Sequence, residues 1–125
     1  MTTLTTSKLT NHLGYEITRW DGAQDDFDLN SFRYWQAVQV QASLASIENL
    51  VAEWTDQELM EYQVELALDL WSDAHQAYRD SDNTSFFSSD MQFTAKARAS
   101  GQAAVADWFG QLVVGRTTIL TGTRR

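Results

Sequence analysis

The two histidines of the chain, His12 and His75, are the first residues to test for nucleophilic catalysis. A Ser-His-Asp site is recognised by its geometry rather than by a sequence spacing, and no G-x-S-x-G nucleophile elbow is present. Cysteine is absent, which excludes a thiolate nucleophile, a disulfide framework and a zinc site built on thiolates. An enzyme would need a polar pocket around one of the histidines. We predict instead that both are surface residues and that the protein is not an enzyme.

A metal site is the second kind of chemistry to consider. The segment Asp80–Thr84 begins like a calcium loop, but Ser85 stands where such loops have glycine and Met91 where they have a bidentate glutamate. We therefore interpret it as an ordinary loop. Four more acids fall in a polar, turn-like segment, where we expect them to be solvated: Asp21, Asp25, Asp26 and Asp28. Glycine-rich phosphate-binding patterns are also missing, so no metal and no cofactor is expected.

An acidic row on one face of a predicted helix is the most unusual feature of the sequence. Its carboxylates recur every three or four residues: Glu58, Glu61, Glu65, Asp69 and Asp73. General acids need burial or crowding to shift their pKa values, and an exposed row offers neither. The row is either a solvated face or a surface that docks on a basic partner. We assign it as a candidate partner-binding surface, together with four residues of the C-terminal tail: Arg116, Ile119, Arg124 and Arg125.

Charge is distributed unevenly along the 125 residues, whose net charge is −8. Residues 1–52 contain six acids and three bases (net −3), residues 53–90 ten acids and one base (−9), and residues 91–125 one acid and five bases (+4). Phosphate contacts need Lys and Arg, so direct nucleic-acid binding is not expected. The basic tail could instead meet the acidic row of a neighbouring copy. We therefore expect other protein subunits as partners, and a homo-oligomer.

The sequence also bears on where the protein resides. No apolar run approaches the roughly 18 residues of a membrane span, and the N-terminus lacks the basic and apolar regions of a signal peptide. We expect an intracellular, soluble protein with no membrane partner.

The elements that must position these residues are mainly helical. We expect an N-terminal arm, residues 1–29, with a short helix over 3–13 that ends at Gly14, and then a short β-prone segment over 15–20. The first long helix is predicted over 30–54, capped by Asn30 or Ser31. Its apolar residues follow a helical spacing: Val40, Leu44, Ile47, Val51 and Trp54.

Two further long helices are predicted. Thr55 and Glu58 form a capping box at the start of the second, over 56–79, which has a wide apolar arc opposite its acidic row. The third, over 88–114, is rich in alanine and ends at Gly115, before a tail over 115–125 that contains a β-prone run at 117–121. Gly101 and Gly110 weaken this helix.

These expectations give a single, mainly all-α domain: a bundle of three long helices with a short N-terminal helix and short β-prone terminal segments. The second and third long helices should run antiparallel. The predicted core consists of Trp35, Leu44, Ile47, Val51, Leu66, Leu70, Trp71, Trp108 and Leu112.

Three segments give the chain a likeness in layout to a known family: Leu4–Gly14 (LTTSKLTNHLG), the capped amphipathic helix from Thr55 to Tyr78, and the alanine-rich helix from Ala95 to Trp108. In these it resembles the small helical head–tail connector (adaptor) proteins of tailed bacteriophages. The resemblance implies a ring component that assembles between a portal and a tail, and hence a place in the virion. It implies no catalytic residues, and the helix over 31–54 and the five Trp have no counterpart in it.

The function we expect is therefore structural. The first hypothesis is a non-enzymatic assembly protein that acts through protein–protein contacts, such as a head–tail connector subunit. The alternative is an acidic binding protein or inhibitor that docks its Glu/Asp helix face on a basic partner surface.

Overall fold

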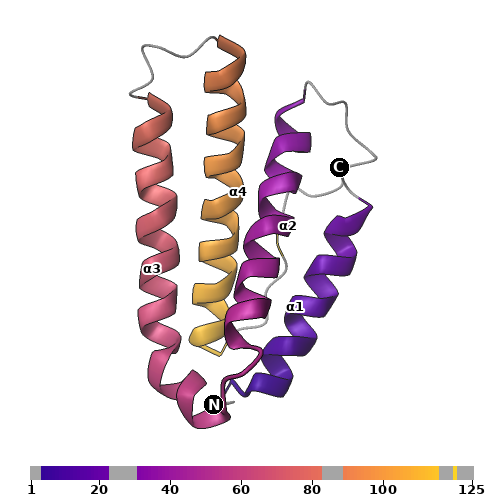
Figure 1. Ribbon diagram of the computed structural model, residues 1–125, viewed down its shortest axis with the longest axis vertical. Helices are drawn as coiled ribbons and strands as arrows, with labels where there is room; N and C mark the ends of the chain where they lie inside the picture. Colours follow the sequence, from indigo (N-terminus) through magenta and orange to yellow (C-terminus); the bar gives the residue numbers. More distant parts are fainter. Residues whose placement is uncertain (1–3, 23–30, 83–88, 116–119, 121–125) are drawn as a thin grey trace.

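The protein folds into four α-helices in the part of the chain that its computed structural model describes, which is residues 4–22, 31–82, 89–115 and 120 (Figure 1). Helix α1 spans Thr6–Asp21, α2 Phe32–Val51, α3 Asp56–Asp82 and α4 Ser89–Val113. Within these residues no strand is present. The mainly all-α prediction is confirmed.

Side-chain caps fix where the helices begin. The Ser31 hydroxyl accepts a hydrogen bond from the amide of Tyr34 at 3.0 Å, which selects Ser31 as the cap of α2. The predicted capping box is present at α3. The Glu58 amide donates to Thr55 Oγ1 at 3.1 Å, and the Thr55 amide donates to Glu58 Oε1 at 3.0 Å. Both caps depend on residues that are close in sequence, so sequence patterns could predict them.

Helix α4 ends at a glycine, as predicted. Gly115 has a φ of 84°, in the left-handed region that favours glycine, and its amide donates to the Leu112 carbonyl at 3.0 Å. The chain can leave the helix at this point without steric strain.

The four helices lie in the order α3, α4, α2, α1 across the molecule (Figure 1). Helix α4 packs against both α3 and α2, most extensively against α3, and α1 packs on α2. Figure 1 shows α3 and α4 running antiparallel, as predicted. Helix α3 is therefore an outer helix whose main neighbour is α4.

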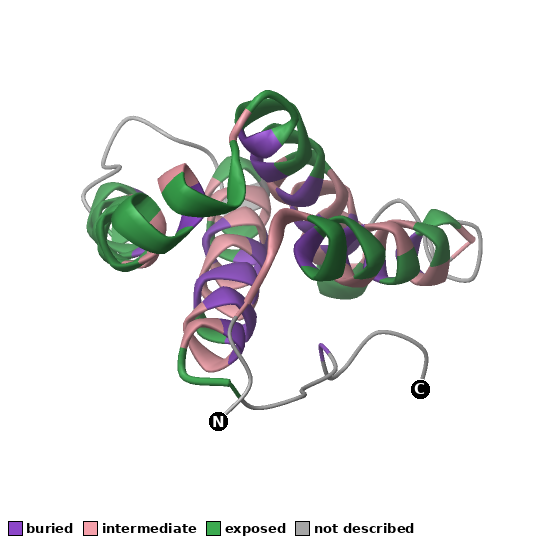
Figure 2. Cartoon of the chain, turned by 90° about the horizontal axis from the view of Figure 1, so that it is seen from below, coloured by how far each residue is buried: buried purple, intermediate pink, exposed green. Residues whose placement is uncertain are grey.

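The hydrophobic core lies where α1, α2 and α4 meet. Its fully buried members include Leu13 and Trp20 of α1, Leu44 of α2, and Trp108 and Phe109 of α4. Burial is concentrated in these helices, whereas α3, at the left in both views, is largely exposed (Figure 2).

The N-terminal arm differs from its prediction. Residues 15–20, predicted as β-prone, form the second half of α1, and the predicted 3–13 helix continues through Gly14 instead of ending there. The apolar residues Leu9, Leu13 and Trp20 share one side of α1 and are buried. Because packing a helical face onto α2 buries more than a two-stranded pair could, tertiary contacts override the local β preference.

The remaining helix boundaries shift by at most three residues, and the start at Asp56 does not shift. The helix predicted over 30–54 is Phe32–Val51, 56–79 becomes Asp56–Asp82, and 88–114 becomes Ser89–Val113. The β-prone run at 117–121 lies outside the described residues except for Leu120, which is buried and is not in a strand.

The predicted core is largely correct, with one clear error. Five of the nine residues are buried: Leu44, Ile47, Val51, Trp108 and Leu112. Leu66 and Leu70 are half-buried, as is Trp35, over whose ring the Arg98 guanidinium lies 5.2 Å from the centroid. Trp71 is 45% exposed, so its prediction as a core residue is wrong.

Among the described residues, no helix is long and apolar enough to cross a membrane.

Candidate functional site

The predicted acid–base and metal candidates do not assemble into a site in the described part of the chain. His12 is half-buried on α1, whereas His75 is exposed on α3. In the described ranges, no three His, Cys, Asp or Glu side chains lie close enough to hold a metal ion together.

The calcium-loop comparison rests on a segment that is partly helical. Asp80, Ser81 and Asp82 are the last residues of α3, and the Ser81 hydroxyl donates to the Tyr78 carbonyl at 2.7 Å. The prediction of a loop over Asp80–Thr84 is therefore wrong up to Asp82, and the rest of that segment lies outside the described residues. A calcium loop needs extended ligand positions, which a helical turn does not provide.

The acidic row is exposed along α3. Exposure is expected both for a solvated face and for a surface that docks on a basic partner. Glu61, Glu65, Asp69 and Asp73 are exposed, whereas Glu58 is half-buried and accepts the Thr55 amide in the helix cap. The four tail residues assigned with the row lie outside the described residues: Arg116, Ile119, Arg124 and Arg125.

A groove separates α2 from α3 on the side of the acidic row. It has a volume of about 530 Å³ and is lined from α2 by Ile47 and Leu50 and from α3 by Leu70 and Asp73, with Gln102 of α4 between them. Next to it, a smaller hollow of about 300 Å³ lies between Trp54 and Tyr62. The mixed polar and apolar lining brings no catalytic group together.

The other exposed side of α3 is apolar. Five large side chains protrude there, and together they are called the apolar face of α3 below: Met60 (51% exposed), Val64 (56%), Leu68 (65%), Trp71 (45%) and Tyr78 (40%). Of the 27 residues of α3, only Leu59, Ala74 and Ser81 are buried. Helix α4 covers one side of the wide apolar arc, where the Trp71 indole lies close to Gly110, and the outer part of the arc has no covering helix in the described chain.

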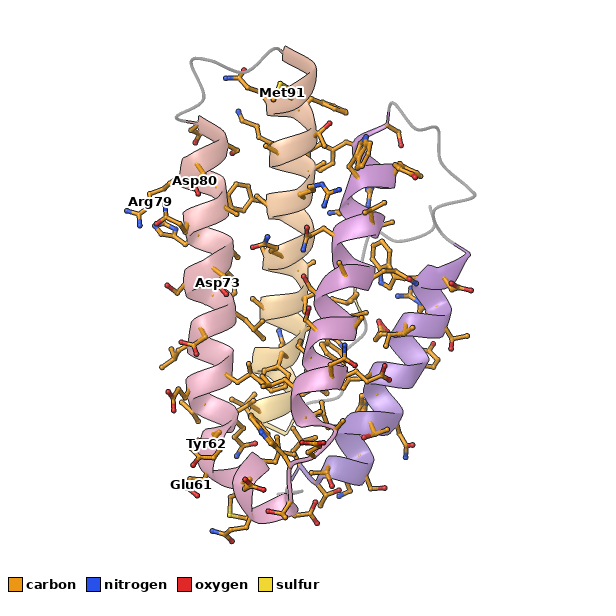
Figure 3. All side chains as sticks on the ribbon, viewed as in Figure 1. Glu61, Tyr62, Asp73, Arg79, Asp80 and Met91 are labelled. Atoms are coloured by element: carbon orange, nitrogen blue, oxygen red, sulfur yellow. The ribbon has the colours of Figure 1, made fainter. Side chains whose placement is uncertain are left out.

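Two opposite charges border this apolar face. Glu61 and Arg79 are 18 residues apart, which is five helical turns of 3.6 residues, so both lie along the same side of α3, near its two ends (Figure 3). Arg79 points away from the other helices and donates within α3 to Gln76 Oε1 at 3.1 Å. One edge of the apolar face thus has an anionic group near one end of α3 and a cationic group near the other end.

A buried carboxylate was missed by the sequence analysis. Glu16 of α1 is 1% exposed, and its Oε1 accepts the Leu120 amide at 3.2 Å and lies 3.7 Å from Arg19 Nη1. Arg19 Nη1 also donates to the Leu120 carbonyl at 2.6 Å. Burial raises the pKa of Glu16, and the Leu120 hydrogen bond and the Arg19 charge offset only part of that rise. The pair holds Leu120 on α1, a contact between distant residues that no local pattern could reveal.

A second long-range contact joins the beginnings of α1 and α3. Asp56 Oδ1 accepts hydrogen bonds from the Thr6 amide at 2.8 Å and from the Thr6 hydroxyl at 2.7 Å. These bonds hold the pKa of Asp56 below its ordinary value. Both polar contacts are structural, so the surface of α3 remains the candidate functional site.

Compared with known proteins, the chain matches no protein family, no curated protein and no solved structure.

Proposed function

We propose that the protein is a non-enzymatic assembly protein that acts through protein–protein contacts made by α3. The supporting observation is the exposure of the five side chains of its apolar face on a 27-residue helix that buries only three residues. Contiguous exposed apolar surface on a folded protein is characteristic of interaction sites. A partner that covers this face removes apolar area from water and stabilises the helix.

The test is the mass in solution, measured by light scattering on the whole chain. We expect a mass above the 14.2 kDa of one chain, and a fall toward that value in Leu68→Glu. Leu68 is 65% exposed, so the substitution should leave the helical circular dichroism signal intact. Ala45→Glu adds the same side chain at an exposed position of α2 and is the matched control. A single-chain mass that neither substitution changes would contradict the proposal.

A phage head–tail connector subunit is the specific form of this proposal that the sequence resemblance supports. Ring subunits contact their neighbours through two different surfaces, so a ring needs a second surface besides the apolar face of α3. The basic C-terminal tail is our candidate for it, set against the acidic row of the next copy. High salt should then dissociate the ring, and truncation after Gly115 should abolish it while the helical signal remains. An unchanged mass in both experiments would exclude this form.

The second candidate function is an acidic binding protein that docks on a basic partner. It is favoured by the exposure of Glu61, Glu65, Asp69 and Asp73, none of which forms an ion pair within the described residues. Reversing Glu61, Glu65 and Asp69 to Lys should abolish binding of a polylysine probe at low salt without unfolding the protein. Equal binding by the triple variant would eliminate this candidate.

A further inference from the structure

We infer that the apolar face of α3 binds the same face of a second copy of this chain, with the two α3 helices antiparallel. This inference rests on the proposed function, because it names the partner of the surface proposed there. It is derived from the positions of apolar and charged residues along α3.

The apolar face has the form of a helix–helix contact. Met60, Val64, Trp71 and Tyr78 follow helical spacings along α3, and Leu68 lies beside them. Met60 and Tyr78 are about 27 Å apart along the axis, at a rise of about 1.5 Å per residue. Between Met60 and Tyr78, Glu61 lies at the edge of this face, and the other carboxylates of α3 lie on its acidic side.

Charge complementarity selects a second copy as the occupant. Glu61 and Arg79 lie along the same edge of the face, so a copy turned end to end sets its Arg79 opposite Glu61 and its Glu61 opposite Arg79. The contact is then self-complementary, as a two-fold interface must be. A parallel two-fold arrangement would place the two copies of this edge on opposite sides of the contact, so that neither Glu61 nor Arg79 would face an opposite charge.

A single alignment satisfies the apolar and charged pairs together. Pairing Met60 with the second copy's Tyr78 centres the contact on residue 69, and pairing Glu61 with Arg79 centres it on residue 70. The same alignment places Leu68 against Trp71 of the second copy, at the middle of the contact. Pairing Leu68 with Trp71 centres the contact on residue 69.5, so the three centres lie within one residue of each other, about 1.5 Å along the helix, and one two-fold axis can serve all three pairs to that tolerance.

The net charge of −8 opposes this association and supplies a salt signature. Screening reduces the general repulsion between two acidic copies more than it weakens an apolar contact. We therefore expect the dimer to persist or strengthen as salt is raised. A contact between the acidic row of one copy and the basic tail of another would instead dissociate as salt is raised.

Cross-linking tests the orientation directly, because the chain has no native cysteine. Disulfides form only between cysteines whose Cα atoms lie within about 7 Å. Mixing M60C with Y78C should give a disulfide-linked dimer under mild oxidation, whereas each variant alone should not. E65C, on the acidic side of α3, is the control and should not link to M60C, to Y78C or to itself. Cross-linking of M60C to itself and of Y78C to itself would overturn the antiparallel arrangement.

Charge reversal tests the ion pairs independently. E61R and R79E should each weaken dimerisation by about tenfold, because each replaces two attractive pairs with two repulsive ones, and the double variant E61R/R79E should restore it. E61R makes the chain less negative, so an effect of net charge alone would strengthen association. E65R makes the same change of charge away from the contact and is the matched control. Failure of the double variant to restore the dimer would overturn the pairing.

The results of these experiments distinguish a failure of the antiparallel contact from a failure of the proposed assembly function of α3. A multi-chain mass that Leu68→Glu abolishes, without the M60C–Y78C link, overturns the antiparallel contact and leaves α3 as the assembly surface. A single-chain mass at every concentration and salt overturns both the self-contact and the proposed assembly function.

Discussion

At the scale of single residues, the least expected group is the carboxylate of Glu16. It is almost fully buried, yet it accepts one backbone amide and lies near one guanidinium. A buried carboxylate is tolerated only when hydrogen bonds or charges compensate its desolvation. Here the compensation is incomplete, since one of its two oxygens has no hydrogen-bond partner among the described residues and its pKa is raised.

Stability should therefore depend on the protonation of Glu16. The folded protein binds this proton more tightly than the unfolded chain, whose carboxyl has the ordinary pKa of 4.5. The contribution to the free energy of unfolding is fully present below pH 4.5 and is lost as pH rises through the higher, folded-state pKa. Glu16→Gln should remove this loss, so that the stability of the wild type falls relative to the variant with rising pH.

Urea unfolding from pH 4 upward measures this difference. The control is Glu48→Gln, which removes one charge from the exposed surface of α2 and corrects for the change in net charge. A constant stability difference between wild type and Glu16→Gln at every pH would contradict the assigned role.

At the scale of the helices, two glycines inside helices have opposite roles. A Cβ at Gly101 of α4 would lie 2.7 Å from the Gln36 carbonyl oxygen and 2.9 Å from Gln39 Cβ. The absence of a side chain there lets α2 and α4 approach closely. Gly14, in the middle of α1, has nothing within 4 Å of such a Cβ.

Alanine at the two positions should shift stability in opposite directions. Gly101→Ala should destabilise by about 1–3 kcal/mol, because the backbone of α2 must move. Gly14→Ala should stabilise by roughly 0.5–1 kcal/mol, because alanine favours the helix and meets no neighbour. Thermal or urea unfolding of the two variants provides the measurement, and each serves as the control for the other. Changes of the same sign would show that the approach of α2 to α4 is not limited by Gly101.

The capping box gives a second prediction for a helix. Thr55→Ala should cost about 1 kcal/mol, because it leaves the Glu58 amide at the start of α3 without its acceptor. Thr55→Ser keeps the hydroxyl and should retain most of the stability in urea unfolding. Equal losses in both variants would point to the methyl group rather than the cap.

These elements also show what the sequence could predict. The caps at Ser31, Thr55 and Gly115 were predictable because each acts within a few residues of the chain. Residues 15–20 were assigned wrongly because short apolar runs satisfy the spacing of a strand and of a helix, and only packing on α2 decides between them. Neither the link between Glu16 and Leu120 nor that between Asp56 and Thr6 has any local signal.

Only part of the candidate site could be predicted from the sequence, because periodicity indicates the faces of a helix but not the neighbours that cover them. Periodicity predicted both the acidic row and the wide apolar arc of α3. It could not predict how many neighbours cover the arc, so Trp71 was placed in the core although α4 alone packs extensively on that helix. The exposed apolar face is the part of the arc that one neighbour leaves uncovered.

At the scale of the whole molecule, α3 lies at one end of the packing order α3, α4, α2, α1. Only the side of α3 that faces α4 packs extensively on another helix. Helix α2 packs against α1 and α4, whereas α3 has extensive contacts with α4 alone. Helix α3 buries only three of its 27 residues, whereas α1 buries four of 16 and α2 five of 20, so much of the surface of α3 remains exposed. Association through its apolar face would give α3 a second packed surface.

Stability should consequently depend on protein concentration. If the folded chain associates and the unfolded chain does not, mass action raises the Tm as concentration increases. Differential scanning calorimetry over a wide concentration range should show this rise for the wild type and for E65R, and a smaller rise for E61R. A Tm that is independent of concentration in all three would mean that the uncovered face of α3 does not bind a second copy. The stability of α3 would then have to come from its packing on α4 alone.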